Sequence, residues 1–310
     1  MSQSLAFVFP GQGSQQLQML SELAKQYPLV EQTFAEASKV LGYDLWALTQ
    51  DGPEADLNST DKTQPALLTS GVAIWRVWQE QGGEQPTLLA GHSLGEYTAL
   101  VCAGVMTLEQ GVKLVEKRGQ FMQSAVPAGQ GAMAAILGLD DEKTRQACDS
   151  AAQGEVVSAV NYNSPGQVVI AGQKAAVARA VDLCKEAGAK RAVELPVSVP
   201  SHCALMKPAA EQLSAELDAI ALQMPKIPVV QNVDAAVATS VEQIKQNLVA
   251  QLYSPVLWAD TVVAMAAQGS ETLLECGPGK VLSGLNKRIQ RSLSVAAIND
   301  VAGLDKALGR

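Results

Sequence analysis

The feature that most constrains this fold is the sequence Gly-His-Ser-Leu-Gly at residues 91–95, which follows the apolar residues 88–90 and precedes a helical pattern. Gly-x-Ser-x-Gly at the end of a strand is typical of a nucleophile elbow, a turn so tight that a Cβ at Gly91 or Gly95 would collide with neighbouring backbone. Ser93 would then be held strained, with its hydroxyl exposed. The same pattern also arises by chance in ordinary loops. With a strand before it and a helix after it, it predicts an elbow with Ser93 as the nucleophile.

Length and composition limit the remaining possibilities. A chain of 310 residues with 47% hydrophobic content can form one large domain with an insertion, or two domains. The sequence contains no run of about 18 apolar residues, the length that a membrane span needs, and its first residues lack a basic-then-apolar signal pattern. We therefore expect a cytoplasmic protein. The five cysteines are scattered without Cys-x-x-Cys spacing, which argues against a metal site or disulfides. The net charge of −8 disfavours a nucleic-acid partner.

The chain opens with an expected strand at 5–9 that ends in the glycine-rich loop 10–15. A phosphate-binding interpretation is weak, because Gly-Lys-Ser/Thr is absent and Gln16 stands where a dinucleotide motif needs its third glycine. The loop is better suited to supply a second oxyanion donor beside the N–H of Leu94, although an ordinary strand-to-helix turn is the alternative. Helices are expected at about 16–40 and 64–81.

A helix is expected from about 107 to 126, and its helical projection places Arg118 within the apolar face. A guanidinium that faces the core keeps its charge and needs an anion, and none of the nearby acids lies on the same face. Arg118 therefore either forms a structural ion pair with a distant acid or binds a substrate carboxylate.

Residues 131–196 show a different pattern. In chain order they predict a strand, a helix, two strands, a helix and a final strand, the βαββαβ order of a ferredoxin-like unit. The expected elements are strands at 132–137, 156–161, 167–171 and 191–197 and helices at 140–152 and 173–187.

The search for a general base is short, because the chain has only two histidines. His92 is the immediate neighbour of Ser93, and the side chains of adjacent residues on a sharp turn diverge. His202, at the start of an expected helix that reaches about Ile220, is therefore the candidate base. A lone histidine at a helix start is often only structural, and Cys203 is a weak rival nucleophile without a second histidine to activate it.

The last third rebuilds an alternating α/β pattern, which implies a mainly parallel sheet with the site at the carboxyl ends of its strands. We expect strands at 229–233 and 272–275, helices at 241–252 and 255–268, and a turn at 277–279. Two groups of basic residues stand out in this acidic chain, either as partner-binding patches or as plain solvated faces. They are Lys280, Lys287, Arg288 and Arg291, and the pair Lys190 and Arg191.

With these residues identified, the chain resembles the malonyl-CoA:acyl carrier protein transacylases of type II fatty acid synthesis over nearly its whole length. The resemblance rests on several stretches together, which are far more specific than the elbow alone. They are Pro-Gly-Gln-Gly-Ser-Gln at 10–15, Gly-His-Ser-Leu-Gly at 91–95, Arg118, Asn-Ser-Pro-Gly-Gln at 163–167, Pro-Ser-His at 200–202, Gln251 and Gly-Pro-Gly at 277–279. One departure is Gln18, where the family often has glycine.

The resemblance implies a catalytic Ser93–His202 dyad, with the histidine oriented by a backbone carbonyl near Gln251. It also implies an oxyanion hole formed by the N–H groups of Gln12 and Leu94, and binding of the malonyl carboxylate by Arg118. The implied fold is an α/β-hydrolase-like catalytic domain, residues 1–128 and 199–310, with a ferredoxin-like subdomain inserted at 129–198. The implied substrates are malonyl-CoA and acyl carrier protein, and no cofactor is needed. We expect the carrier protein to dock on the two groups of basic residues, and we expect the enzyme to be a monomer.

The expected reaction is ping-pong transfer of a malonyl group through malonyl-Ser93. Two alternatives stay open on the sequence. One is a serine thioesterase that uses the same dyad with water, and the other is a non-catalytic module that only docks the carrier protein.

Overall fold

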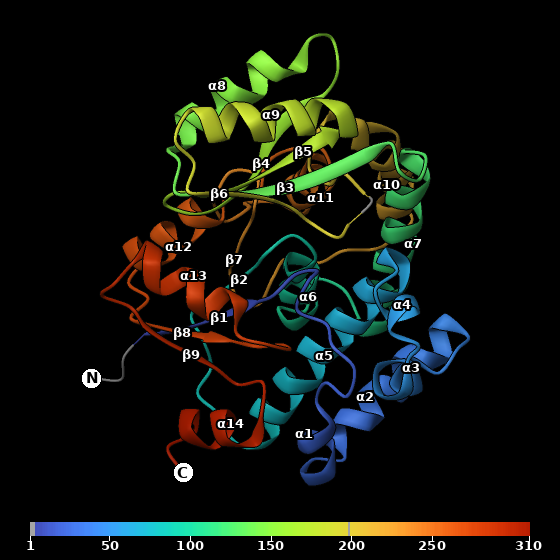
Figure 1. Cartoon of the computed structure of the whole chain (residues 1–310). Coiled ribbons are helices and arrows are strands. Elements are labelled where there is room, and N and C mark those ends of the chain that lie inside the picture. Colours follow the sequence, from blue (N-terminus) through green and yellow to red (C-terminus); the bar gives the residue numbers. More distant parts are fainter. Residues whose placement is uncertain (1–3, 198) are drawn as a thin grey trace.

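The computed structural model describes residues 4–197 and 199–310 and contains two separate sheets (Figure 1). The first is parallel throughout, with strand order β7-β2-β1-β8-β9. A parallel sheet was expected, because the strands alternate with helices along the chain. The strands are β1 (Leu5–Phe9), β2 (Leu88–Gly91), β7 (Val229–Val230), β8 (Thr272–Glu275) and β9 (Ser294–Ala297).

The central strand β1 is buried on both faces, as a parallel sheet covered by helices requires. Phe7 and Phe9 pack into the larger core with residues of α5 (Thr60–Glu80) and α6 (Leu94–Cys102). Ala6 and Val8 point to the opposite face, into a second cluster with residues of α12 (Trp258–Ala267) and α13 (Val281–Ile289). The alternation of strand side chains thus explains why helices cover both faces.

The second sheet is antiparallel, with strand order β4-β5-β3-β6, and α8 and α9 cover one of its faces (Figure 1). Its elements follow the predicted order strand, helix, strand, strand, helix, strand. They are β3 (Gly131–Leu137), α8 (Asp141–Ala152), β4 (Val157–Ser164), β5 (Gln167–Gln173), α9 (Lys174–Glu186) and β6 (Arg191–Glu194). Tyr162 of β4 donates its N–H to the carbonyl of Val256, which connects this sheet to the rest of the chain.

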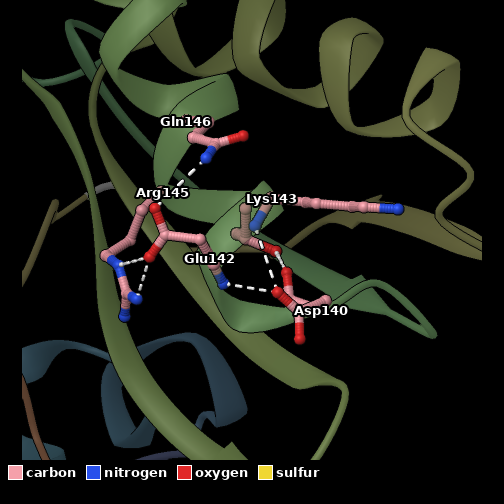
Figure 2. A network of polar contacts seen from close by, with 6 residues as sticks. Asp140, Glu142, Lys143, Arg145 and Gln146 are labelled. Carbon is pink, nitrogen blue, oxygen red and sulfur yellow. Dashed lines mark hydrogen bonds and ion pairs between the residues drawn. The ribbon is translucent and has the colours of Figure 1, made fainter.

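Local capping explains where α8 begins. Figure 2 shows the Asp140 carboxylate accepting hydrogen bonds from the backbone N–H groups of Glu142 and Lys143. These donors belong to the first turn, which has no intrahelical acceptors. The side chain of Arg145 pairs with Glu142 one turn along the same helix.

The expectation of one helix over residues 16–40 was wrong. The chain forms a short α1 (Ser21–Gln26) and then α2 (Leu29–Leu41), separated at Tyr27 and Pro28. Proline has no N–H to continue the helix and disfavours helical geometry in the residue before it. The short helices α3 (Leu45–Asp51) and α4 (Glu54–Leu57) were not predicted.

The expected helix start at His202 was also wrong. His202 has φ 63°, in the left-handed region, and the chain passes through the 3₁₀ turn Ala204–Met206 before α10 (Lys207–Asp218) begins. In the C-terminal part, α13, β9 and α14 (Val301–Ala307) were not predicted. The helices α7 (Leu108–Ala125) and α11 (Val241–Gln251) lie close to the predicted limits. None of the helices among the described residues is long and apolar enough to cross a membrane.

Candidate active site

Ser93 stands between β2 and α6 on a strained turn, with φ 52° and ψ −106°. A Cβ on Gly91 would lie 1.9 Å from the carbonyl carbon of Gly95, and one on Gly95 would lie 2.0 Å from the carbonyl oxygen of Phe9. Real Cβ atoms do not approach so closely, so both positions require glycine. The elbow geometry predicted from the sequence is present.

The structure brings His202 to Ser93 although the two lie far apart in the chain. The Ser93 Oγ lies 2.8 Å from the His202 Nε2, and the His202 Nδ1–H donates to the backbone carbonyl of Gln251 at 2.7 Å. Because Nδ1 carries the proton, Nε2 is left to accept the proton of Ser93. Burial and the positive charge of Arg118 lower the pKa of His202 to about 3, which keeps the imidazole neutral.

Asn232 holds the backbone on the amino-terminal side of the nucleophile, a role that the sequence analysis missed. Its Oδ1 accepts the N–H of Ser93 at 2.7 Å and its Nδ2 donates to the carbonyl of Gly91 at 2.7 Å. Gly91 is the last residue of β2 and Ser93 stands on the turn after it, and this buried amide satisfies both backbone groups. No motif signals this residue, because it follows β7 far along the chain.

Arg118 reaches the same site from α7 and is only 1% exposed. Its Nη1 donates to the Gln64 Oε1 at 2.7 Å, and its Nη2 donates to the Gln251 Oε1 at 3.0 Å and lies 3.3 Å from the Ser93 Oγ. Its partners are neutral oxygens, and among the described residues it forms no ion pair, so the structural ion pair considered above is not found. Burial without a direct anion lowers the pKa of this guanidinium.

Gln251 connects the three groups. Its backbone oxygen accepts from His202, and its Oε1 accepts from Arg118. Its Nε2 donates to the backbone oxygen of Ser93 and to the Glu96 Oε2, both at 3.0 Å. Glu96 was not predicted as a site residue, although one acid within the apolar helix Leu94–Cys102 was a usable signal.

The other two candidate side chains point to other partners. His92 donates from Nε2 to the Asn163 Oδ1 at 2.8 Å, and burial lowers its pKa. The Cys203 thiol donates to the carbonyl of Pro200 at 3.2 Å, and burial raises its pKa to about 11, so it stays protonated. This geometry favours His202 over His92 as the partner of Ser93, and Ser93 over Cys203 as the nucleophile.

The glycine-rich loop after β1 lies directly against the elbow. A Cβ on Gly11 would come within 2.5 Å of the His92 carbonyl oxygen, and the His92 N–H donates to the Phe9 carbonyl at 3.0 Å. Leu94 is the first residue of α6, and a first-turn N–H has no acceptor within its own helix. Gln12 and Leu94 both line a cavity of about 120 Å³ that also contains Ser93, Arg118 and His202.

The departure at Gln18 has a physical explanation. Its φ is 63°, in the left-handed region where glycine is unstrained and other residues are not. Its N–H donates to the Thr49 carbonyl at 2.8 Å, which holds the loop in place. Glycine would therefore fit this backbone at least as well as glutamine.

All six basic residues proposed for carrier docking are exposed. The two groups approach each other, because the Arg288 Nη1 on α13 donates to the Gln167 Oε1 at 3.0 Å, and Gln167 and Arg191 both pair with Leu137 of β3. Lys280 lies 4.0 Å from the Asp300 carboxylate. Among the described residues no group of three or more His, Cys, Asp or Glu could hold a metal ion.

Comparison with known proteins identifies the family of this chain. The acyl transferase domain family matches residues 6–306. The malonyl CoA-acyl carrier protein transacylase of Salmonella typhimurium is 62% identical over 303 residues, with 98% of each chain covered.

Two solved structures are similar over almost their whole length. An acyl carrier protein S-malonyltransferase from Vibrio cholerae is 66% identical, with a TM-score of 0.96 and coverage of 98% of this chain and 99% of the other. A malonyl-transacylase solved in complex with its type II PKS acyl-carrier protein is 62% identical, with a TM-score of 0.98 and 99% of each chain covered. The elbow, the Ser93–His202 pair and the buried Arg118 thus lie in a chain that belongs to the acyl transferase domain family and is similar over nearly its whole length to malonyl CoA-acyl carrier protein transacylases.

Proposed function

We propose that this protein transfers a malonyl group from malonyl-CoA to the phosphopantetheine thiol of an acyl carrier protein. The observation that carries the proposal is the placement of a buried, charged Arg118 beside a Ser93–His202 pair, with the Arg118 Nη2 3.3 Å from the Ser93 Oγ. A nucleophile next to a fixed cation suits an acyl group that ends in a carboxylate. The names of the relatives support the same reaction.

In the first half-reaction His202 Nε2 takes the proton of Ser93 as the Ser93 Oγ forms a bond to the thioester carbonyl carbon. The negative charge on the carbonyl oxygen is stabilised by the N–H groups of Gln12 and Leu94, which line the cavity. The C–S bond then breaks, and the thiolate of CoA takes the proton from His202. The carrier protein's thiol reverses these steps on malonyl-Ser93.

The base is held by the backbone carbonyl of Gln251, because a hydrogen bond at Nδ1 fixes both the tautomer and the ring orientation. The low pKa of His202 suits a base that must start neutral. The oxygens of Ser93 and Gln251 bonded to the Arg118 Nη2 are both uncharged, so a substrate carboxylate would be the first anion to contact this guanidinium within the described site.

Carrier docking is proposed on the two exposed basic groups, which the Arg288–Gln167 hydrogen bond joins at one edge. Acyl carrier proteins are acidic, so these charges would speed their association. The docking residues are Lys190, Arg191, Lys280, Lys287, Arg288 and Arg291.

The finer fold description is part of the proposal. We assign residues 1–128 and 199–310 to an α/β-hydrolase-like catalytic domain and 129–198 to a ferredoxin-like subdomain, supported by the βαββαβ order and the antiparallel sheet. Residue 198, at the boundary, lies outside the described residues. We further propose a cytoplasmic monomer that needs no metal or cofactor and binds no nucleic acid.

Intact mass spectrometry after mixing with malonyl-CoA tests the function. The wild type should gain one malonyl group and Ser93→Ala none, and added carrier protein should remove the group by becoming malonylated itself. An adduct that persists on Ser93→Ala would overturn the assignment. Release of free malonate at a rate comparable to transfer would show a thioesterase instead.

A further inference from the structure

Glu96 is a buried carboxyl group that the proposed mechanism does not use. It lies on α6 one turn after the nucleophile and is 1% exposed. Its Oε2 accepts from the Asn232 N–H at 2.9 Å and from the Gln251 Nε2 at 3.0 Å, and its Oε1 accepts from the Gln231 Nε2 at 3.0 Å. All three partners donate to Glu96 and none accepts from it, which suits an ionised carboxylate.

The Gln251 amide connects this carboxylate to the guanidinium of Arg118. Its Nε2 donates to Glu96 and its Oε1 accepts from the Arg118 Nη2, each at 3.0 Å. The amide cannot reverse, because its oxygen would then face the carboxylate and the Ser93 carbonyl, and its NH₂ would face the cation. Opposite charges are therefore held on the two sides of one neutral amide.

We propose that Glu96 is the counter-ion of Arg118, kept one amide away so that the guanidinium stays open to a substrate carboxylate, and that Glu96 thereby tunes selectivity for malonyl over uncharged acyl groups. A carboxylate in direct contact would compete for the same N–H donors. From the far side of the Gln251 amide, the Glu96 carboxylate offsets part of the positive charge of Arg118 and repels an incoming carboxylate. The inference rests on the proposed malonyl transfer.

Glu96 acts here as a positioning residue through Gln251 and Arg118. Burial raises the pKa of Glu96 to about 7, so its charge changes within an accessible pH range. The other ionisable groups that face it are Asp234, joined through the Asn247 and Gln231 amides, its neighbour Tyr97, and Arg118 and His202 beyond Gln251. His202 acts on both acyl groups alike, so its titration cancels in a ratio.

The test compares acylation of Ser93 by malonyl-CoA and by acetyl-CoA, as kcat/KM, in the wild type and in Glu96→Gln at pH 8.5. Loss of the negative charge should raise the malonyl-to-acetyl ratio by roughly 3- to 30-fold, mainly through a lower KM for malonyl-CoA. Glu275→Gln is the matched control, since Glu275 is equally buried but accepts from the Leu282 and Ser283 N–H groups at the start of α13. Its ratio should equal that of the wild type.

An unchanged ratio in Glu96→Gln would overturn the proposal, and a lower ratio would show instead that Glu96 holds Arg118 in place. If the variant does not fold, the wild type alone provides the test. Its malonyl-to-acetyl ratio of kcat/KM should rise as the pH falls from 8.5 to 6 and Glu96 becomes protonated, and a ratio that does not change with pH would overturn the proposal. A wild type that takes up no malonyl group would refute the proposed function as well. Normal malonylation with an invariant ratio refutes only the role of Glu96.

Discussion

Replacing Arg118 gives the sharpest test of substrate selectivity. In the proposed complex the guanidinium makes a charge-assisted contact with the malonyl carboxylate inside a cavity of about 120 Å³. Arg118→Gln removes the charge and leaves that carboxylate unpaired, at a cost of roughly 2–5 kcal/mol of transition-state binding. At 1.36 kcal/mol for each factor of ten, kcat/KM for malonyl-CoA should fall by about 30-fold to several thousand-fold.

Acetyl-CoA should respond in the opposite direction. Its methyl group leaves the buried guanidinium without an anion in direct contact in the wild type, and the variant removes that penalty. Arg118→Lys is a useful intermediate, because it keeps the charge but loses the planar fork that now contacts Gln64 and Gln251 together. We expect its malonyl-to-acetyl ratio to lie between those of the wild type and Arg118→Gln.

The assay is rapid-quench acylation of Ser93 with each thioester, followed by intact mass spectrometry, with thermal unfolding measured in parallel. Stability will fall too, because the Gln64 and Gln251 acceptors lose a charged donor, and each unsatisfied buried acceptor costs roughly 1–3 kcal/mol. That loss affects both substrates equally and leaves the ratio unchanged. Equal losses for malonyl-CoA and acetyl-CoA would refute the reasoning and leave Arg118 a purely structural residue.

Three further predictions concern other parts of the site. His202→Ala should slow acylation roughly 100-fold or more, while His92→Ala should act mainly through packing of the elbow, and a reversed order of the two rates would reassign the base. Since the pKa of His202 is lowered to about 3, stopped-flow acylation by malonyl-CoA should show no loss from His202 protonation near pH 6.5, and a rate that halves near that pH would contradict the burial argument. By linkage, the folding stability contributed by the neutral imidazole should be lost as the pH falls from about 6.5 towards 3. Charge reversal of Lys287 and Arg288 should raise KM for the carrier protein and leave acylation by malonyl-CoA intact, and an unchanged carrier KM at low salt would exclude this surface.

The loop after β1 offers a separate prediction on stability. Gln18→Gly should leave activity intact and change the free energy of unfolding by no more than about 1 kcal/mol, in the stabilising direction, because relief of the left-handed strain at φ 63° outweighs the added chain entropy of glycine. Urea unfolding measures this difference. A destabilisation of several kcal/mol would show that the Gln18 side chain holds the loop.

The sequence was sufficient for those parts of the site where one residue type is sterically or chemically required. Gly91 and Gly95 leave no room for a Cβ, and a buried arginine must find polar partners, so Ser93 and Arg118 could be recognised without coordinates. Because the chain has only two histidines, elimination of His92 left His202 as the candidate base. The order of strands and helices in residues 131–194 was predictable for a similar reason, because its hydrophobic periods are regular.

The remaining features depend on contacts that no local pattern encodes. The amides of Asn232 and Gln251 look like ordinary polar residues in sequence, and only the fold aligns them with groups more than a hundred positions away. The helix expected to start at His202 fails because tertiary contacts hold that residue at φ 63°. α13 was missed although its apolar residues recur at helical spacing, because the pattern covers only nine residues and contains Gly284, a poor helix former.

The hydrogen bonds from Asn232 to the elbow have a consequence for how the enzyme folds during synthesis. The N–H of the strained Ser93 and the carbonyl of Gly91 are both hydrogen-bonded by the side chain of Asn232, 139 residues after Ser93. The base and its carbonyl partner also follow in the second half of the chain. A nascent chain that has emerged only as far as α9 therefore contains the nucleophile in sequence but lacks the groups that shape and activate it. We therefore expect Ser93 to become reactive only after residues 199–252 have folded against it.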